Sequence, residues 1–465
     1  MSLSLTQGNV AGVLVRFSLP FLLSSLIQTV YSSVNMIILG WFASPASLAG
    51  AGNGGMLIMS LMNIFWGFST GGMILLGQYY GAKQEDNTAK AFGNAILINA
   101  VTALAGIALV FTCGQLFLRI TNVPMELDEK GLHAYGEAWR YMRIFSVGLL
   151  FNAGYNLISA SLRALGDSRT PLVIIAISCA ANVVLDLFFV GALHMGASGA
   201  ALATILAQAA GFALSLLYLW RHKLPFRFSR ADLRPDGRMI RTIGRLGLPI
   251  SLQVALNTLS FILIAAIINK MGLYASSANG IVNNIVNVCM IIPFAFGSAL
   301  SAISAQNLGA GKIGRALEST RYGILFSLVV AVPATILANL YPAAIVSVIT
   351  PNPDVVEAAA RFLIPFSWDF LLVSFLFCIN GLLNGCGITT FVAVHETVAA
   401  LLVRAPLSWA LSLLPGATLF HVGIGTPAAT LASLVMCFIY YRLKLSGGRL
   451  AQLHIAGAGR EEPGE

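Results

Sequence analysis

The chain has 465 residues, of which 57% are hydrophobic and 10% are charged, and its mean hydropathy is +0.82. Soluble domains carry about 25% charged residues, so the composition excludes a soluble globular protein and predicts a polytopic membrane protein. Apolar runs take up most of the length, and there is neither a phosphate-binding glycine loop nor room for a nucleotide-binding domain. ATP hydrolysis is therefore excluded. The six cysteines lie nearly all within apolar runs and lack paired ligand spacing, so they indicate neither disulfides nor a metal site.

Twelve apolar runs follow one another along the chain. The first, beginning near residue 10, is too long for a cleaved signal segment and predicts a membrane helix. We therefore expect an all-α membrane protein with twelve transmembrane helices, near residues 12–39, 49–76, 91–118, 134–162, 168–190, 194–219, 241–268, 276–304, 317–346, 356–384, 388–413 and 417–442.

The basic residues orient these helices. If the amino terminus lies in the cytoplasm, 20 of the 27 Lys and Arg residues fall on the inner side and 6 on the outer side, with Arg404 left at membrane depth. The positive-inside rule thus predicts a multi-pass cell-membrane protein with both termini in the cytoplasm. The net charge of +9 comes mostly from these basic residues in the cytoplasmic loops, where anionic membrane lipid attracts them. It therefore requires no nucleic-acid partner.

An internal repeat divides the chain into halves. Residues 18–21 match 247–250, residues 77–82 match 305–310, and Phe145-Ser146 with Gly166 matches Phe366-Ser367 with Gly387, at offsets of 229, 228 and 221. Six helices per half give both halves the same orientation, which predicts two lobes related by a pseudo-two-fold axis along the membrane normal, with substrate bound in the cleft between them. We expect an N-lobe at 1–220, a cytoplasmic linker at 221–240, a C-lobe at 241–445 and a cytoplasmic tail at 446–465.

One acidic residue lies in the middle of an apolar segment. Asp186 is in the fifth run, and Asn182 precedes it by one helical turn, so both side chains share a face. An ionised carboxylate at bilayer depth is costly unless it is hydrated, paired or protonated, and its default interpretation is functional. The alternative is a buried aspartate satisfied by neighbouring amides for packing.

Several motifs resemble the multidrug and toxic compound extrusion (MATE) family, in its prokaryotic, DinF-like branch. The resemblance runs from about residue 10 to residue 445, and its most specific part is Leu-Arg-Ala-Leu-Gly-Asp-Ser-Arg-Thr-Pro at 162–171. It is also carried by Leu19-Pro20, by Gly77-Gln78 with Gly81-Ala82, by Asn182 with Asp186, and by residues 199–204. The resemblance implies the fold of that superfamily, the MOP fold, and cation-coupled export of bulky amphipathic or cationic compounds.

The resemblance also implies where the cation is handled. In this branch the fifth-helix aspartate acts with an asparagine one turn before it and an acid on the first helix, which correspond to Asp186, Asn182 and position 35. Here the chain departs from the pattern, because Asn35 stands where the family usually has aspartate. The C-lobe acids of other branches are also missing: Asn257 replaces a glutamate, and Val373 is apolar where an aspartate is expected.

Neutral polar residues could complete the cation site. Tyr31 and Asn35 are four residues apart, and with Thr204 they can offer oxygens to a sodium ion or a proton relay. The alternative role of such residues is hydrogen bonding between helices. Asn152 and Asn156, also four apart, and Asn257 are candidates for the substrate cavity.

Three further groups lie at membrane depth in the second half. His395 and Glu396 are adjacent in the eleventh run, upstream of Arg404, and Asp369 lies in the tenth. Glu396 and Arg404 are about 12 Å apart along a helix, which is long for direct contact, so other partners are expected. We treat Glu396, His395 and Asp369 as secondary ionisable candidates. Glu396 and Arg404 could form a structural pair, or the acid could be a second proton site in the C-lobe.

These observations favour a monomeric antiporter driven by H⁺, with Na⁺ as the alternative ion, for small amphipathic or cationic drugs and dyes. We expect no enzymatic activity and no cofactor. A lipid-linked saccharide flippase of the same superfamily is the nearer rival, but it would need a cationic cavity for diphosphate, and Arg404 is nearly alone at depth. An intramembrane transferase is more remote, because polar residues are dispersed through both halves instead of clustered near one interface.

Overall fold

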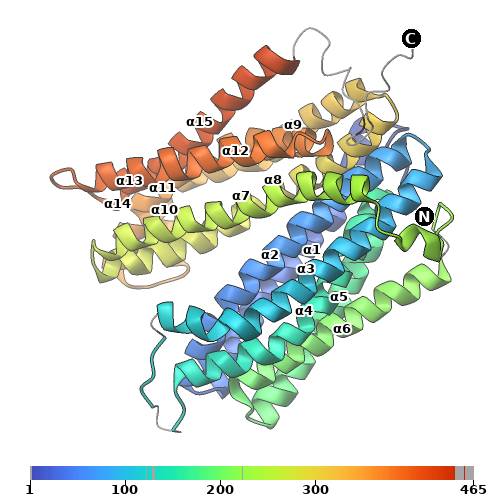
Figure 1. The fold of residues 1–465 in the computed structure, drawn as a ribbon. Helices are drawn as coiled ribbons and strands as arrows, with labels where there is room; N and C mark the ends of the chain where they lie inside the picture. Colours follow the sequence, from blue (N-terminus) through green and yellow to red (C-terminus); the bar gives the residue numbers. More distant parts are fainter. Residues whose placement is uncertain (1–2, 122, 128–130, 223, 446–454, 456–465) are drawn as a thin grey trace. The chain divides into compact units, whose positions relative to one another are not determined.

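The computed structural model describes residues 3–121, 123–127, 131–222, 224–445 and 455. Within these residues, twelve helical segments are long and apolar enough to cross a membrane, and the one strand-like feature is an isolated bridge between Leu127 and His133 (Figure 1). The predicted all-α fold with twelve spans is confirmed. The predicted tail at 446–465 lies outside the described residues, apart from Ile455.

The α-helices are α1 (Val10–Phe42), α2 (Pro45–Gly81), α3 (Glu85–Ile120), α4 (Ala134–Ala164), α5 (Arg169–Asp186), α6 (Gly196–Arg221), α7 (Gly237–Asn269), α8 (Leu273–Gly309), α9 (Ile313–Leu340), α10 (Pro342–Ser347), α11 (Pro353–Gly385), α12 (Thr389–Val398), α13 (Ala405–Ser412), α14 (Leu419–Gly423) and α15 (Gly425–Tyr440). Three π-helical segments continue them, namely η1 (Leu187–Ala192), η3 (Ala399–Arg404) and η4 (Tyr441–Leu445), and η2 (Arg230–Leu233) is a 3-10 turn.

The ninth span ends earlier than its apolar pattern predicted. The expected run at 317–346 is divided into α9, which ends at Leu340, and the short α10, which begins at Pro342. Proline lacks the N–H that would continue the helix, and the preceding Tyr341 has an extended φ of −130°. Hydropathy did not register this break because Tyr341 and Pro342 interrupt the backbone without adding charge.

The chain packs as two compact units. The first comprises Met1–Leu3 and Pro20–Ser251, and the second comprises Ser4–Leu19 and Leu252–Glu465. Both divisions fall inside helices, at Pro20 in α1 and two residues beyond Pro249 in α7. Prolines inside helices remove one backbone hydrogen bond each and permit bending at these points. The lobe limits expected from the sequence stay predictions.

Residues 4–19 belong to the second unit because their backbone is held by the turn between α8 and α9. The Arg315 guanidinium donates to the carbonyls of Gln7 and Gly8, both at 2.7 Å, and Asn307 donates to the carbonyl of Leu5 at 3.1 Å. Leu5 is itself fully buried. This docking satisfies carbonyl groups that precede α1.

The sequence repeat corresponds to equivalent helix ends in the two units. At the end of α2, the Ala82 amide donates to the Gln78 carbonyl at 3.0 Å, and at the end of α8 the Ala310 amide donates to the Gln306 carbonyl at 3.0 Å. The next residue has a left-handed backbone in both cases, with φ of +59° at Lys83 and +69° at the glycine at 311. The repeated motif therefore encodes a helix C-cap.

A second pair of helix ends follows the same rule. Gly166 after α4 and Gly387 after α11 have φ of +88° and +81°, and their amides donate to Arg163 and Asn384 carbonyls at 3.0 and 2.9 Å. Glycine takes this conformation without steric cost, which explains why the motif ends in glycine in both halves. These turns lead directly into α5 and α12, which carry the buried acids Asp186 and Glu396.

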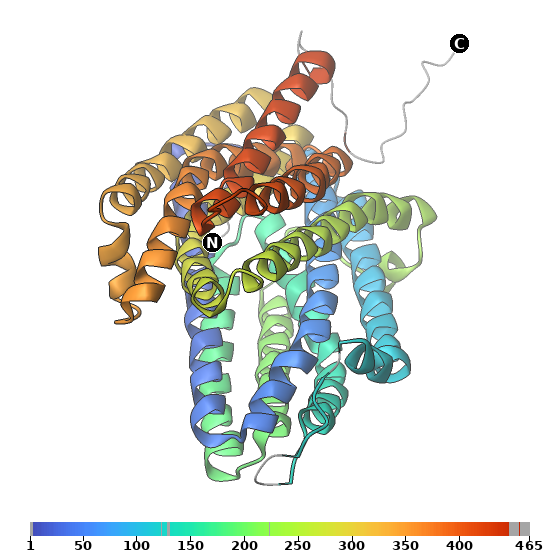
Figure 2. The same ribbon diagram turned by 90° about the vertical axis from the view of Figure 1, so that its left-hand side faces the viewer.

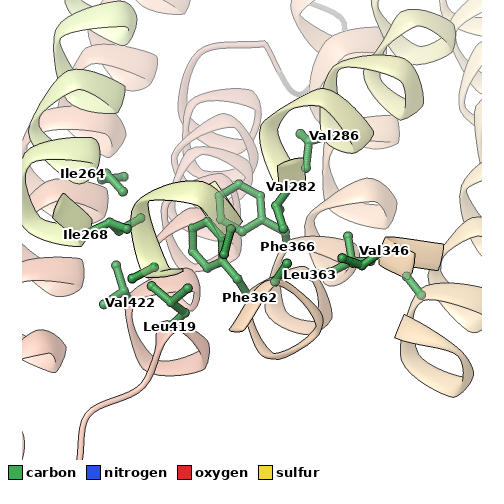
Figure 3. Packing of buried hydrophobic residues seen from close by; sticks show 14 of the residues in the cluster. Ile264, Ile268, Val282, Val286, Val346, Phe362, Leu363, Phe366, Leu419 and Val422 are labelled. Atoms are coloured by element: carbon green, nitrogen blue, oxygen red, sulfur yellow. The ribbon is translucent and has the colours of Figure 1, made fainter. Parts of the chain in front are cut away.

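Each unit has its own apolar core. In the first unit α2, α3 and α4 pack together around buried residues that include Phe65, Met142 and Phe145. In the second unit α11 packs along α8 and α9 (Figures 1 and 2). Figure 3 shows its core, where the Phe362 and Phe366 rings lie edge to face with centroids 4.7 Å apart. These cores fix the helices on which the polar residues lie.

Candidate functional site

Asp186 is the last residue of α5, and the π-helical segment η1 begins directly after it. Its exposed fraction is 0%, and the span in which this acidic residue lies has a high mean hydropathy. Single π-helical turns widen the helix locally and occur often at functional sites. The chain thus places a carboxyl group at a point of irregular backbone inside the membrane span.

Asn182 and Thr204 lie beside this carboxyl group. The Asn182 amide satisfies its hydrogen bonds when its nitrogen faces Asp186: in that orientation Nδ2 donates to Asp186 Oδ2 at 2.6 Å, and Oδ1 accepts from the Thr204 amide at 3.1 Å and hydroxyl at 3.3 Å. The predicted one-turn spacing therefore brings the amide into direct contact with the carboxylate. Thr204 comes from α6, so the contact joins two helices.

Tyr31 and Asn35 approach the same place from α1. The Tyr31 hydroxyl interacts with the side chains of Thr204 and Asn35, and it also lies within electrostatic range of Asp186. The five residues predicted to handle the cation are therefore brought together by α1, α5 and α6. Their function remains a prediction.

The polar α4 residues lie apart from this group, and the prediction that Asn152 and Asn156 belong to the substrate cavity stays a prediction. Asn156 Nδ2 donates to Asn152 Oδ1 at 2.9 Å, and no hydrogen bond among the described residues joins either amide to Asp186. Tyr141, about three to four turns earlier on α4, lies within electrostatic range of Asp186 and Tyr31. Sequence reasoning missed Tyr141, because a tyrosine near a helix end has no distinctive spacing.

The first-unit site has more acceptors than donors. Asp186 Oδ1 and Asn35 Oδ1 are both buried and have no hydrogen-bond partner among the described protein atoms. Buried polar atoms are nearly always paired, so two unpaired oxygens in one site require a proton, an ion or water. Chemically, protonation would convert the carboxyl group into a donor, and carboxylate and amide oxygens are also ligands for a monovalent cation.

Sequence reasoning also missed a buried acid near the start of α4. Glu137 is 5% exposed, accepts from the Ser47 hydroxyl at 2.9 Å and pairs with Arg140 at 3.3 Å. It joins the beginning of α2 to α4. Because its oxygens have a hydroxyl and a guanidinium as donors, it is satisfied as a carboxylate and resembles a structural contact.

The second unit holds a different buried network. Glu396 on α12 accepts from Asn380 at 2.6 Å and from Asn257 at 3.0 Å, and the Asn257 oxygen accepts from Arg404 Nη1 at 2.9 Å. The Arg404 guanidinium lies over the Phe261 ring at 4.4 Å. Glu396 and Arg404 are thus connected through Asn257, as their long spacing suggested, and Asn257, a predicted cavity residue, belongs to this network. Asn380 was missed because a single amide in an apolar run gives no signal.

His395 and Asp369 lie at the margins of this network. His395 Nε2 is 3.6 Å from the Cys437 sulfur, and its other ring nitrogen has no partner among the described atoms. Asp369 interacts with Thr430 and Arg404. The secondary ionisable candidates therefore do not form one contact group: Glu396 is the centre, Asp369 acts through Arg404, and His395 faces a thiol.

The fold and these sites define a multi-pass membrane protein with a buried carboxyl group in a helical span. The MatE family model matches residues 20–188 and 249–410, one segment in each repeat. The chain belongs to the MatE family, which confirms the predicted family, while the DinF-like branch stays a prediction.

Relatives cover almost the whole chain. It is 28% identical over 441 residues to "Probable multidrug resistance protein YpnP" of Bacillus subtilis, a match that covers 94% of this chain and 96% of the relative. It is 23% identical over 451 residues to "Multidrug export protein MepA" of Staphylococcus haemolyticus, covering 94% and 95%.

Solved structures agree in fold. The chain matches a MATE crystal structure in the straight conformation with a TM-score of 0.87 and 17% identity, covering 95% of this chain and 97% of that one. The values are the same for a MOP superfamily transporter from Pyrococcus furiosus. At this identity the likeness establishes the fold alone.

Proposed function

We propose that the chain is a cation-coupled antiporter that exports bulky amphipathic or cationic compounds by alternating access between its two lobes. The observation that carries the proposal is the fully buried Asp186, which keeps one unpaired oxygen inside a membrane span of a MatE family protein. The names of the relatives YpnP and MepA, which refer to multidrug resistance and export, support the substrate class.

The coupling ion in this proposal is H⁺. In a hydrated state of the site, Asp186 is ionised and attracts a cation; in a dehydrated state, loss of solvent favours the neutral acid. A protonated Asp186 gains a donor, which the site lacks while Asn35 and Asp186 both offer bare oxygens. Sodium is the alternative, since the same oxygens suit a monovalent ion. Because Asn35 is neutral, one carboxyl group carries the exchange.

The remaining parts of the proposal concern the setting. We infer a plasma-membrane monomer with both termini in the cytoplasm, on the distribution of basic residues, and a transporter with neither enzymatic activity nor a cofactor. Protonation shifts the population between two conformations, with bending at Pro20 as a mechanical element in α1.

Purified protein in proteoliposomes tests the proposal. Uptake of a fluorescent cationic dye is measured with protons concentrated inside, with sodium concentrated inside, and with no gradient. Antiport driven by H⁺ gives accumulation in the first condition, abolished by a protonophore. Accumulation with sodium alone would assign Na⁺ instead, and no accumulation of any of several cationic or amphipathic dyes in either gradient would contradict the proposed function.

A further inference from the structure

The buried charges of the second unit do not cancel. Three ionisable side chains with formal charges lie deep within its described spans: Asp369 on α11 is 3% exposed, Glu396 on α12 is 8% exposed and Arg404 at the end of η3 is 9% exposed. Two carboxylates and one guanidinium leave one negative charge in excess. A buried site in a membrane span cannot leave a charge uncompensated without a large energetic cost.

Glu396 is satisfied as an ionised carboxylate. Each of its oxygens accepts from an amide, Asn380 at 2.6 Å and Asn257 at 3.0 Å, and Asn257 in turn accepts from Arg404 at 2.9 Å. Because the amide of Asn257 is polarised by the guanidinium at its oxygen, it donates more strongly to the carboxylate. Glu396 is therefore linked to Arg404 by hydrogen bonds through Asn257, whereas Asp369 acts on Arg404 through space alone.

Asp369 is the second buried carboxyl group, and it accepts no hydrogen bond from Asn380, Asn257 or Arg404 among the described atoms. It interacts with Thr430 on α15 and, through space, with Arg404, but its Oδ1 is buried and has no hydrogen-bond partner among the described atoms. The remaining titratable groups near the network supply no positive charge: His395 faces the Cys437 thiol, which offers nothing to stabilise an imidazolium, and Cys437 lies within range of Glu396.

We propose that the second unit carries one retained proton, bound to the Asp369 carboxyl group, while Glu396 stays ionised as the partner of Arg404. The proton makes the buried charges of α11, α12 and η3 sum to zero and makes Asp369 a neutral acid. This site is separate from Asp186, and its occupation does not depend on the proposed transport function. It also differs from the C-lobe positions of the family, where this chain has Asn257 and Val373.

Infrared difference spectroscopy of reconstituted protein tests this site directly, since a protonated carboxyl group has a C=O stretch distinct from that of a carboxylate. The Asp186→Asn variant removes the Asp186 carboxyl group from the spectrum, and Glu137, which is satisfied as a carboxylate, should contribute no carboxylic-acid band. This variant is expected to retain one carboxylic-acid band at neutral pH that shifts in D₂O, and Asp186→Asn with Asp369→Asn is expected to lose that band. A band that survives Asp369→Asn would overturn the assignment.

The charge count supplies a second, sharper test. In Asp186→Asn with Glu396→Gln, Asp369 becomes the sole buried counter-charge of Arg404, so the band at neutral pH should disappear although Asp369 is intact. Glu357→Gln is the matched control, because Glu357 is an exposed residue of α11 paired with Arg361, and it should leave the band unchanged. A band that persists in Glu396→Gln would contradict the proposal. So would a wild-type spectrum without a band together with sodium-dependent thermal stabilisation, which would indicate a sodium ion instead of a proton.

Discussion

The two units end equivalent helices in the same way but treat their buried acids differently. Asp186 in the first unit contacts neutral side chains and has one oxygen without a hydrogen-bond partner among the described atoms. Glu396 in the second unit has an amide donor on each oxygen, and one of these amides, Asn257, in turn accepts from the Arg404 guanidinium. A π-helical segment follows each acid, directly after Asp186 and three residues after Glu396. The comparison teaches that two repeats can share helix ends while the fifth and eleventh spans place their buried acids in different hydrogen-bonding surroundings.

The acids also lie at different depths along their helices. Asp186 comes 20 residues after Gly166, and Glu396 comes 9 residues after the equivalent Gly387, a difference of about 16 Å in helical rise. At the repeat offset of 221, the counterpart of Asp186 is Leu407. The two acids therefore do not occupy equivalent positions of the repeat, and we expect substitutions in each unit to affect different properties.

The largest effect on stability is expected from Arg404→Met. Removing the guanidinium leaves Glu396 without its counter-ion and frees the Asn257 oxygen, and breaking a buried ionic network in this way costs about 3–5 kcal/mol. Thermal unfolding in detergent should show a strong decrease in midpoint. Arg404→Lys, which keeps the charge, should lose less, and equal stability of Arg404→Met and wild type would refute the network's structural role.

Asn257→Ala should have an intermediate effect. The substitution removes the bridge, so Glu396 and Arg404 each lose one hydrogen bond, at about 1–3 kcal/mol. We expect a lower unfolding midpoint. A double-mutant cycle with Glu396→Gln measures the coupling, and strictly additive effects would contradict the bridge.

Asn182→Ala should change coupling in the first unit. Its amide is the hydrogen-bond donor to Asp186, and a differential interaction of about 1–3 kcal/mol corresponds to roughly 5–150-fold in the affinity for the coupling ion. The proton concentration that gives half-maximal dye accumulation is the quantity to measure. Asn87→Ala, at the beginning of α3, is the matched control. If Asn182→Ala gave the same half-maximal proton concentration as this control, Asn182 would have no part in coupling.

The smallest effect concerns the repeated helix end after α2 and α8. Lys83 holds a left-handed backbone at the position where the other copy has glycine, and such a residue is strained by about 1 kcal/mol. We predict that Lys83→Gly slightly raises the unfolding midpoint and that Gly311→Lys lowers it. Opposite signs would show that the two caps are not equivalent.

The sequence was sufficient for the fold because the signals involved are local. Hydropathy located twelve spans, and the repeated motifs at Gly166 and Gly387 marked helix ends whose backbone needs glycine. The one-turn spacing of Asn182 and Asp186 also predicted their contact. By contrast, the contact between Asn257 and Glu396 joins residues 139 positions apart in the chain. Asn380 and Glu396 lie on consecutive helices, 16 residues apart, and no periodicity encodes which amide meets which acid. The burial of Glu137 escaped for the same reason, because its partner Ser47 lies 90 residues earlier. The break at Tyr341 escaped for a different reason: hydropathy, from which the span was predicted, does not register the proline at 342 that ends it.

The central claim is that the first unit carries ion coupling through Asp186. Its most direct test is dye accumulation in proteoliposomes with protons concentrated inside, for wild type, Asp186→Asn and the exposed control Asp86→Asn. Because Asp186→Asn keeps the shape of the side chain but fixes it in a neutral form, we predict a folded protein that binds dye and accumulates none against its gradient, while Asp86→Asn behaves as wild type. Accumulation by Asp186→Asn at the wild-type rate would contradict the account and would direct the search for the coupling group to Glu396.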